Sequence, residues 1–149
     1  MSLARFQSQL MRLVVDTSFR ELTAADPAIF DSDPFLRPRE RRRLANVARS
    51  DGLRITVMLH RGWRLGKLLT LMPGTCAILG PDRLAAELGA FWRDRLPDSL
   101  YFHDEALAFA DYVAQRDDLM AIPSLEGVLA HERARLEARP SLVTVAGSH

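Results

Sequence analysis

The chain has 149 residues, of which 48% are hydrophobic and 26% are charged, and its formal net charge is +1. This length suits one domain, or one domain with a short appendage. No apolar run reaches the roughly 18 residues of a membrane span. Arg5 and Arg12 lie where a signal peptide would have its apolar core, and the single cysteine, Cys76, excludes an internal disulfide. We therefore expect a cytoplasmic protein that does not bind membranes.

The charge is distributed unevenly along the chain. Residues 1–80 carry thirteen basic and seven acidic side chains, whereas residues 81–149 carry seven and twelve. Nineteen of the twenty basic residues are arginine, which indicates either a GC-rich genome or a need for bidentate carboxylate and phosphate contacts. The densest cluster is Arg37-Pro38-Arg39-Glu40-Arg41-Arg42-Arg43. It is typical of a solvated helix face, or of a surface for nucleic acid or an acidic partner.

Residues 1–38 predict a helix followed by an irregular arm. Between residues 3 and 22 the apolar residues recur at helical spacing, at Phe6, Leu10, Leu13 and Val14. Residues 23–38 contain three prolines, each of which removes a backbone donor and disfavours helix at the residue before it. We therefore expect residues 1–38 to form a segment separate from the body of the chain, although the apolar residues Phe30, Phe35 and Leu36 could dock it onto a core.

Residues 39–139 predict a helical domain. Helical patterns occupy residues 39–49, 53–72, 75–79, 81–97, 104–116 and 123–139. Capping and helix-breaking residues separate them at Ser50-Asp51-Gly52, Pro73-Gly74 and Gly80. The short connections favour a mainly α fold, an orthogonal bundle of five or six helices. Its core is expected to contain Trp63, Leu65, Leu69, Pro73, Leu88, Phe91, Phe109 and Val113.

Residues 140–149 form a tail without a helix signal. Leu142, Val143, Thr144 and Val145 have the composition of a strand. The tail therefore predicts either a short C-terminal β-strand that pairs with a partner or a frayed terminus.

The sequence shows no catalytic or metal-binding pattern. The four histidines are not clustered, and no histidine and cysteine spacing suits a metal. Cys76 lies among apolar residues and is interpreted as a small core residue. Gly62-Trp63-Arg64-Leu65-Gly66-Lys67 lacks the features of a phosphate-binding loop. We interpret it as a helical segment in which the small residues allow close packing.

Two stretches resemble a known family. The first is Leu59-His60-Arg61-Gly62-Trp63-Arg64-Leu65-Gly66-Lys67-Leu68-Leu69-Thr70-Leu71-Met72-Pro73, followed by Leu79-Gly80. The second is Ile122-Pro123-Ser124-Leu125-Glu126-Gly127-Val128-Leu129-Ala130-His131-Glu132. Together they are similar to the HvfC/MbnC-like family, often labelled a putative DNA-binding domain, over about residues 53–136.

This resemblance implies an accessory subunit without catalytic activity of its own. Members of the family form a heterodimer with a TIM-barrel-like multinuclear iron enzyme that oxidatively modifies cysteines of ribosomally made precursor peptides. The iron belongs to the partner, so no cofactor is expected in this chain, and the subunit helps to hold the leader of the precursor peptide. The residues expected to contact the partner or peptide are Arg61, Arg64, Lys67, Tyr101, His103, Leu142, Val143 and Val145.

The alternative interpretation is a small bacterial DNA-binding or regulatory protein. Its contact residues would be Arg39, Arg41, Arg42 and Arg43. Aromatic residues do not alternate with these arginines and the whole chain is almost neutral, so nucleic acid is the less favoured partner.

Overall fold

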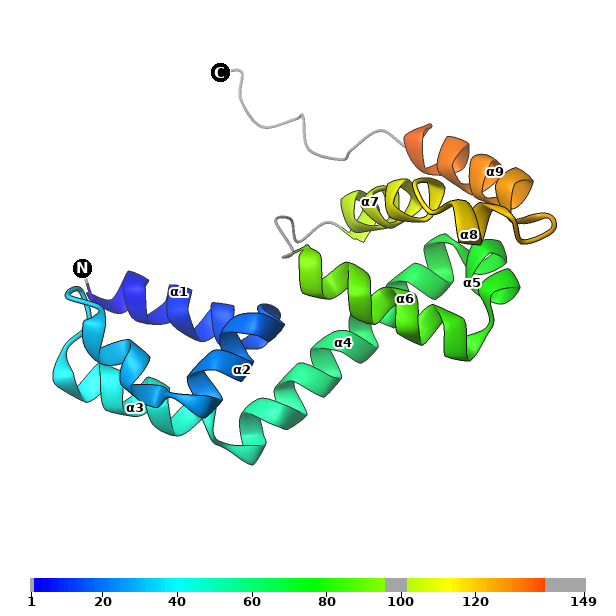
Figure 1. The fold of residues 1–149 in the computed structure, drawn as a ribbon. Coiled ribbons are helices and arrows are strands. Elements are labelled where there is room, and N and C mark those ends of the chain that lie inside the picture. The colour runs from blue at the N-terminus through cyan, green and yellow to red at the C-terminus, as the bar shows by residue number, and fades with distance from the viewer. Residues whose placement is uncertain (1, 96–101, 139–149) are drawn as a thin grey trace, which may run out of the picture. The chain divides into compact units, whose positions relative to one another are not determined.

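The computed structural model describes residues 2–95 and 102–138, which are helical almost throughout (Figure 1). The mainly α fold class is therefore confirmed. These residues contain nine α-helices and one 3₁₀-helix, more than the five or six expected. They divide into two compact units: unit 1 contains residues 2–65 and 92–95, and unit 2 contains residues 66–91 and 102–138. The expected C-terminal strand lies outside the described residues.

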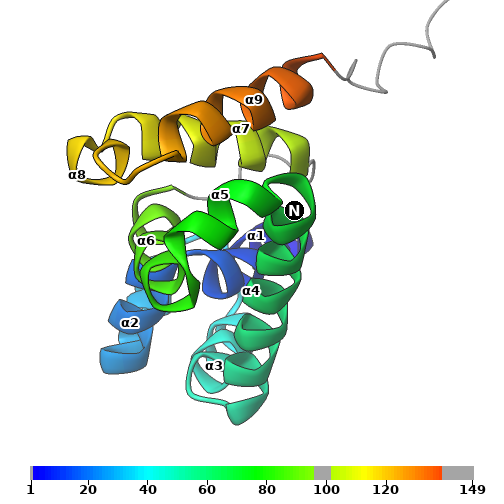
Figure 2. The ribbon, with the colours of Figure 1, turned by 90° about the vertical axis from the view of Figure 1, so that its right-hand side faces the viewer.

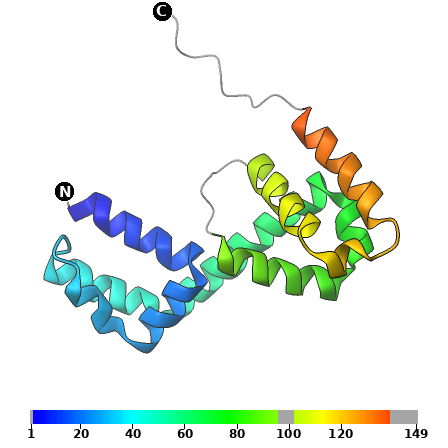
Figure 3. The ribbon, with the colours of Figure 1, turned by 45° about the horizontal axis from the view of Figure 1, so that its top comes forward.

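Unit 1 is formed by the N-terminal helices. It contains α1 (Ser2–Val15), α2 (Thr17–Ala25), the 3₁₀-helix η1 (Pro27–Ser32), α3 (Pro38–Ala48) and the first part of α4 (Asp51–Leu71). The α2 helix packs against α1, η1 and α3, and α1 also contacts α3, an arrangement that can be followed in Figure 3. These contacts enclose a core of Leu13, Phe19, Phe30, Leu36, Leu44, Ala48, Leu53 and Val57.

The expected first helix is divided at Asp16. Its Oδ1 atom accepts a hydrogen bond from the Phe19 N–H over 2.9 Å, which makes Asp16 the N-cap of α2. Its Oδ2 atom pairs with Nε of Arg12 over 3.0 Å. The break turns Phe19 into the core, where its ring meets the edge of Phe30 with centroids 6.0 Å apart. A pattern that predicted one helix therefore forms two.

The arm expected at residues 23–38 is folded into unit 1. Asp33 holds it to α1, because its carboxylate accepts hydrogen bonds from Arg5 Nε over 2.7 Å and from Gln9 Nε2 over 3.1 Å. Burial alone would raise the pKa of Asp33, but these bonds and one from the Phe35 N–H lower it below its usual value. Phe30 is buried against the helices. The expected boundary after residue 38 therefore falls inside unit 1.

Unit 2 contains the remaining helices. They are the end of α4, α5 (Pro73–Leu79), most of α6 (Pro81–Asp94), α7 (Phe102–Ala114), α8 (Asp117–Met120) and α9 (Leu125–Glu137). The α9 helix lies along α7, as Figure 2 shows, and also packs against α5 and α8.

The expected breaks at Pro73-Gly74 and at Gly80 are confirmed, whereas α5 begins at Pro73 instead of residue 75. Pro73 and Pro81 each occupy the first position of a helix, where the missing N–H has no intrahelical partner to lose. Gly80 ends α5 with a φ of 75°, which glycine adopts without a steric penalty. The last helix starts at Leu125 rather than residue 123, because Ser124 has a left-handed backbone with a φ of 68°.

The predicted core is confirmed in part. Leu88, Phe91, Phe109 and Val113 are buried, and the rings of Phe91 and Phe109 lie 5.3 Å apart. Leu65 is half-buried, whereas Trp63, Leu69 and Pro73 are exposed. The assignment of these last three residues to the core was wrong.

A buried carboxylate joins α9 to the start of α5. Glu132 accepts hydrogen bonds from the backbone N–H groups of Gly74, over 2.6 Å, and Thr75, over 3.0 Å. These N–H groups belong to the first turn of α5, where they have no intrahelical acceptor and where the helix dipole favours a negative charge. The approach needs glycine at position 74, because a Cβ there would lie 2.6 Å from Cγ1 of Val128.

We predict that Glu132→Gln destabilises unit 2 by about 2 kcal/mol, since an amide NH₂ would face one of the two N–H donors. Cys76 reports this loss, because it is buried in α5 and is the single cysteine of the chain. Burial, followed by the nearby Glu132 charge, raises the pKa of its thiol to about 11. The measurement is the urea midpoint read by pulse alkylation of Cys76. The exposed Glu126 of the same helix provides the control, and equal midpoints for Glu132→Gln and Glu126→Gln would contradict the prediction.

Candidate functional site

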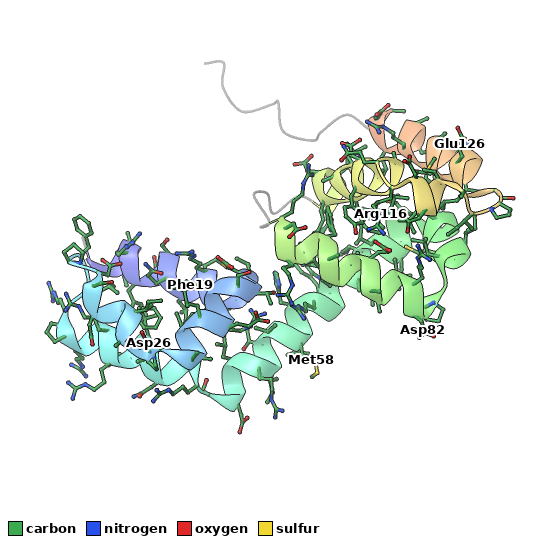
Figure 4. The ribbon with its side chains drawn as sticks, viewed as in Figure 1. Phe19, Asp26, Met58, Asp82, Arg116 and Glu126 are labelled. Carbon is green, nitrogen blue, oxygen red and sulfur yellow. The ribbon has the colours of Figure 1, made fainter. Side chains whose placement is uncertain are left out.

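In unit 1, α4 has apolar side chains on two of its sides. Leu53 and Val57 face the core. On another side Ile55, Met58 and Leu59 are 51%, 64% and 65% exposed. Figure 4 shows Met58 projecting away from the helix. The helical repeat places Gly62 between Met58 and Leu59 around the circumference. We call Ile55, Met58, Leu59 and Gly62 the outer face of α4.

Gly62 has no packing role within the described chain. A Cβ built at Gly62 would meet no atom within 4 Å, and the same holds at Gly66. The expectation that these glycines serve close packing inside the chain was therefore wrong. A glycine inside a helix costs about 1 kcal/mol relative to alanine. At Gly62 no close packing contact within unit 1 offsets this loss of helix stability.

The basic residues expected on α4 have three different environments. Arg61 is half-buried and donates from Nη2 to Oγ1 of Thr17 over 2.8 Å. Arg64 is 4% exposed, and its guanidinium lies 4.6 Å from the ring centroid of Trp92. A buried guanidinium presents no contact surface, so Arg64 is removed from the partner contacts. Lys67 is exposed, with Nζ 5.6 Å from the ring centroid of Phe102.

The other expected contact residues lie in unit 2 or outside the described residues. His103 is half-buried, and its Nε2 atom hydrogen-bonds the backbone carbonyl of Leu136, which ties the start of α7 to the end of α9. Outside the described residues lie Tyr101, Leu142, Val143 and Val145. Of the expected contact residues that the structure describes, Arg61 and Arg64 belong to unit 1, and Lys67 and His103 belong to unit 2.

Two arginines of the cluster, Arg41 and Arg42, line a pocket in unit 1. Arg39, Arg42 and Arg43 are exposed on α3, while Arg41 is half-buried and donates from Nη2 to the Asp33 carbonyl over 2.8 Å. The pocket has a volume of about 620 Å³. Both charge signs line it, through Asp26, Asp31, Arg41, Arg42 and Arg49. Arg41 thus supports the fold, and the pocket is not a purely basic surface.

Charge separates between the two units. The described residues of unit 1 carry fourteen basic and eight acidic side chains, a balance of +6, and those of unit 2 carry five and ten, a balance of −5. The basic half of the sequence therefore becomes a basic unit. An acidic partner is attracted to unit 1 over a distance set by the ionic strength.

A polar network in unit 2 was missed by the sequence analysis. The buried Glu87 of α6 accepts from the Tyr112 hydroxyl over 2.6 Å and from Arg116 Nη1 over 2.9 Å. Burial and the bond to Glu87 raise the pKa of Tyr112. Asp118 pairs with both Arg116 and Arg83, so the network contains two carboxylates and two guanidiniums. The two negative and two positive charges of the network balance, which is typical of a polar network that stabilises the packing of helices. The four-residue spacing of Tyr112 and Arg116 was the available signal.

Residues 2–95 and 102–138 contain neither a cluster of metal-ligating side chains nor a helix that could span a membrane. Three or more metal-ligating side chains do not come together there. In the same ranges, the helices are too short or too polar to cross a membrane.

Comparison of the chain with protein-family models, with curated proteins and with solved structures finds no match. The outer face of α4 differs from an ordinary solvated helix face, because Ile55, Met58 and Leu59 are apolar, adjacent and each more than half exposed.

Proposed function

We propose that this chain is a non-catalytic subunit that docks on a second protein through the outer face of α4. The observation that carries the proposal is the exposure of Ile55, Met58 and Leu59, each more than half exposed on a helix whose opposite side forms a core. A surface helix normally has one apolar stripe and a polar remainder. Adjacent exposed apolar side chains mark sites of protein association.

The chemistry of the partner comes from the resemblance to the HvfC/MbnC-like family. In this proposal the partner is a multinuclear iron enzyme that modifies cysteines of a precursor peptide, and the iron is held by the partner's side chains. The two stretches that carry the resemblance meet in the fold, where Glu132 of the second hydrogen-bonds Gly74, the residue that follows the first. This contact joins the second stretch to the end of the first, whose residues 66–73 lie with it in unit 2, whereas residues 59–65 belong to unit 1.

We further propose that this chain helps to bind the leader of the precursor peptide. The net positive charge of unit 1 supports this role if the leader carries acidic residues. Opposite charges then speed association and orient the two molecules as they meet. Arg61 and Lys67 remain as contact residues, because both reach the surface at least in part.

We predict that Leu59→Glu abolishes partner binding, because it places a charge in the centre of an apolar interface. Leu3→Glu is the matched control, since Leu3 and Leu59 are each 65% exposed and both lie on helices of unit 1. The measurement is size-exclusion chromatography of the tagged chain from its native host, with iron quantified in the eluted complex. Helix content by circular dichroism verifies that both variants fold. Retention of an iron-containing partner by Leu59→Glu, or its loss from both variants, would contradict the proposal.

A second candidate function is nucleic-acid binding by α3. The observation that favours it is the exposure of Arg39, Arg42 and Arg43 on a unit of net charge +6. The predicted result is an affinity for duplex DNA that falls steeply with salt and that Arg42→Glu with Arg43→Glu removes, because phosphate contacts release counterions. Arg41 is left intact, since it holds the Asp33 carbonyl. Fluorescence anisotropy at two salt concentrations measures this, and an affinity insensitive to both changes would exclude the function.

A further inference from the structure

We infer that the outer face of α4 receives an apolar helix with acidic flanks from a different protein, and that the two helices cross at Gly62. The inference rests on the proposed function and adds what kind of element binds there. Gly62 weakens its own helix, and no contact within the described residues requires it.

The position of Gly62 gives it a use at an interface. It lies between Met58 and Leu59 around the helix, one turn after them along the axis, with Ile55 two turns before it. Large side chains therefore surround a point where the backbone is bare. The separation of two packed helices depends on the side chains at their contact point, so a glycine there lets a partner helix approach closely. An alanine methyl at the same point would hold the partner away.

The spacing of the exposed residues matches a helix as the occupant. Ile55, Leu59 and Gly62 are separated by four and three residues, the repeat that forms a straight seam along one helix and fits the ridges of another. Recognition of an amphipathic helix typically uses anchors at this spacing. A partner helix would place its own apolar side chains on both sides of Gly62.

Charge opposes a symmetric contact between two copies of this chain through the outer face of α4. Two copies that met through this face would bring two units of net charge +6 together. Like charges across an interface oppose association. A helix with acidic flanks instead gains from the same field, and it loses that gain as salt is added. The exposed Arg54, next to Met58 on the helix surface, lies at the edge of the seam and pairs with the exposed Asp51 over 3.4 Å. The net charge of unit 1, and not this single pair, is therefore what favours an acidic helix.

The test uses a designed probe, a fluorescent peptide of about 20 residues with leucine at a and d heptad positions and glutamate at the flanking positions. A second peptide carries lysine in place of glutamate. Anisotropy at low salt measures the affinity of each peptide for the full chain. The glutamate peptide is expected to bind about tenfold more tightly than the lysine peptide. Equal affinities, or tighter binding of the lysine peptide, would overturn the charge assignment.

The deciding variant is Gly62→Ala. It is expected to raise the thermal midpoint of the free chain, because alanine favours helix and its methyl meets no atom of the described chain. It is also expected to weaken binding of the glutamate peptide by at least about fivefold, since the helices can no longer approach as closely. Gly89→Ala is the matched control: Gly89 is an exposed glycine of α6 whose added Cβ would also meet nothing. It should raise the midpoint and leave binding unchanged.

The remaining outcomes separate this inference from the proposed function. If Leu59→Glu removes peptide binding and Gly62→Ala does not, docking on α4 stands and the crossing at Gly62 is wrong. If neither variant changes binding, the outer face is not a docking surface and both proposals fail. Reversible self-association in sedimentation velocity that Leu59→Glu abolishes would make the occupant a second copy and overturn the inference.

Discussion

A helix can cover a compact unit with one of its sides, and in unit 1 α4 carries apolar side chains on two. Leu53 and Val57 fix the helix to the core. Because one side is held in this way, the outer face is presented by a helix that cannot rotate to bury it. Ile55, Met58 and Leu59 therefore stay in solvent in the isolated chain. The proposed function and the inference about Gly62 both follow from this geometric constraint.

The helix boundaries that could be predicted depend on local chemistry. Pro73, Gly80 and Pro81 act on the backbone at their own positions, so their effect can be recognised without the fold. The divided first helix was missed because the cap at Asp16 interrupts an apolar pattern that continues through it. Prolines in residues 23–38 indicated an irregular arm, but Pro27 starts a 3₁₀-helix instead of preventing one. Whether a proline ends or begins a helix depends on packing that the sequence does not display.

The candidate site could not be predicted for a related reason. Periodicity in the sequence predicts that α4 is helical. Because the helix has two apolar stripes, the sequence alone does not show which stripe faces the core. Trp63 was assigned to the core and is 54% exposed, while Arg64 was assigned to the surface and is buried against Trp92. The bond between Glu132 and Gly74 joins positions 58 residues apart, a distance at which spacing carries no signal. Conversely, the buried state of Cys76 was predictable from its apolar neighbours.

Methionine oxidation tests the central claim most directly, because the chain contains its own control. Met58 on the outer face and Met11 on α1 are 64% and 57% exposed, so dilute peroxide should oxidise both in the isolated chain. In the complex purified from the native host, the account predicts that Met58 is protected while Met11 is still oxidised, as read by peptide mass spectrometry. Oxidation of Met58 at the same rate in the complex and in the free chain would contradict the account.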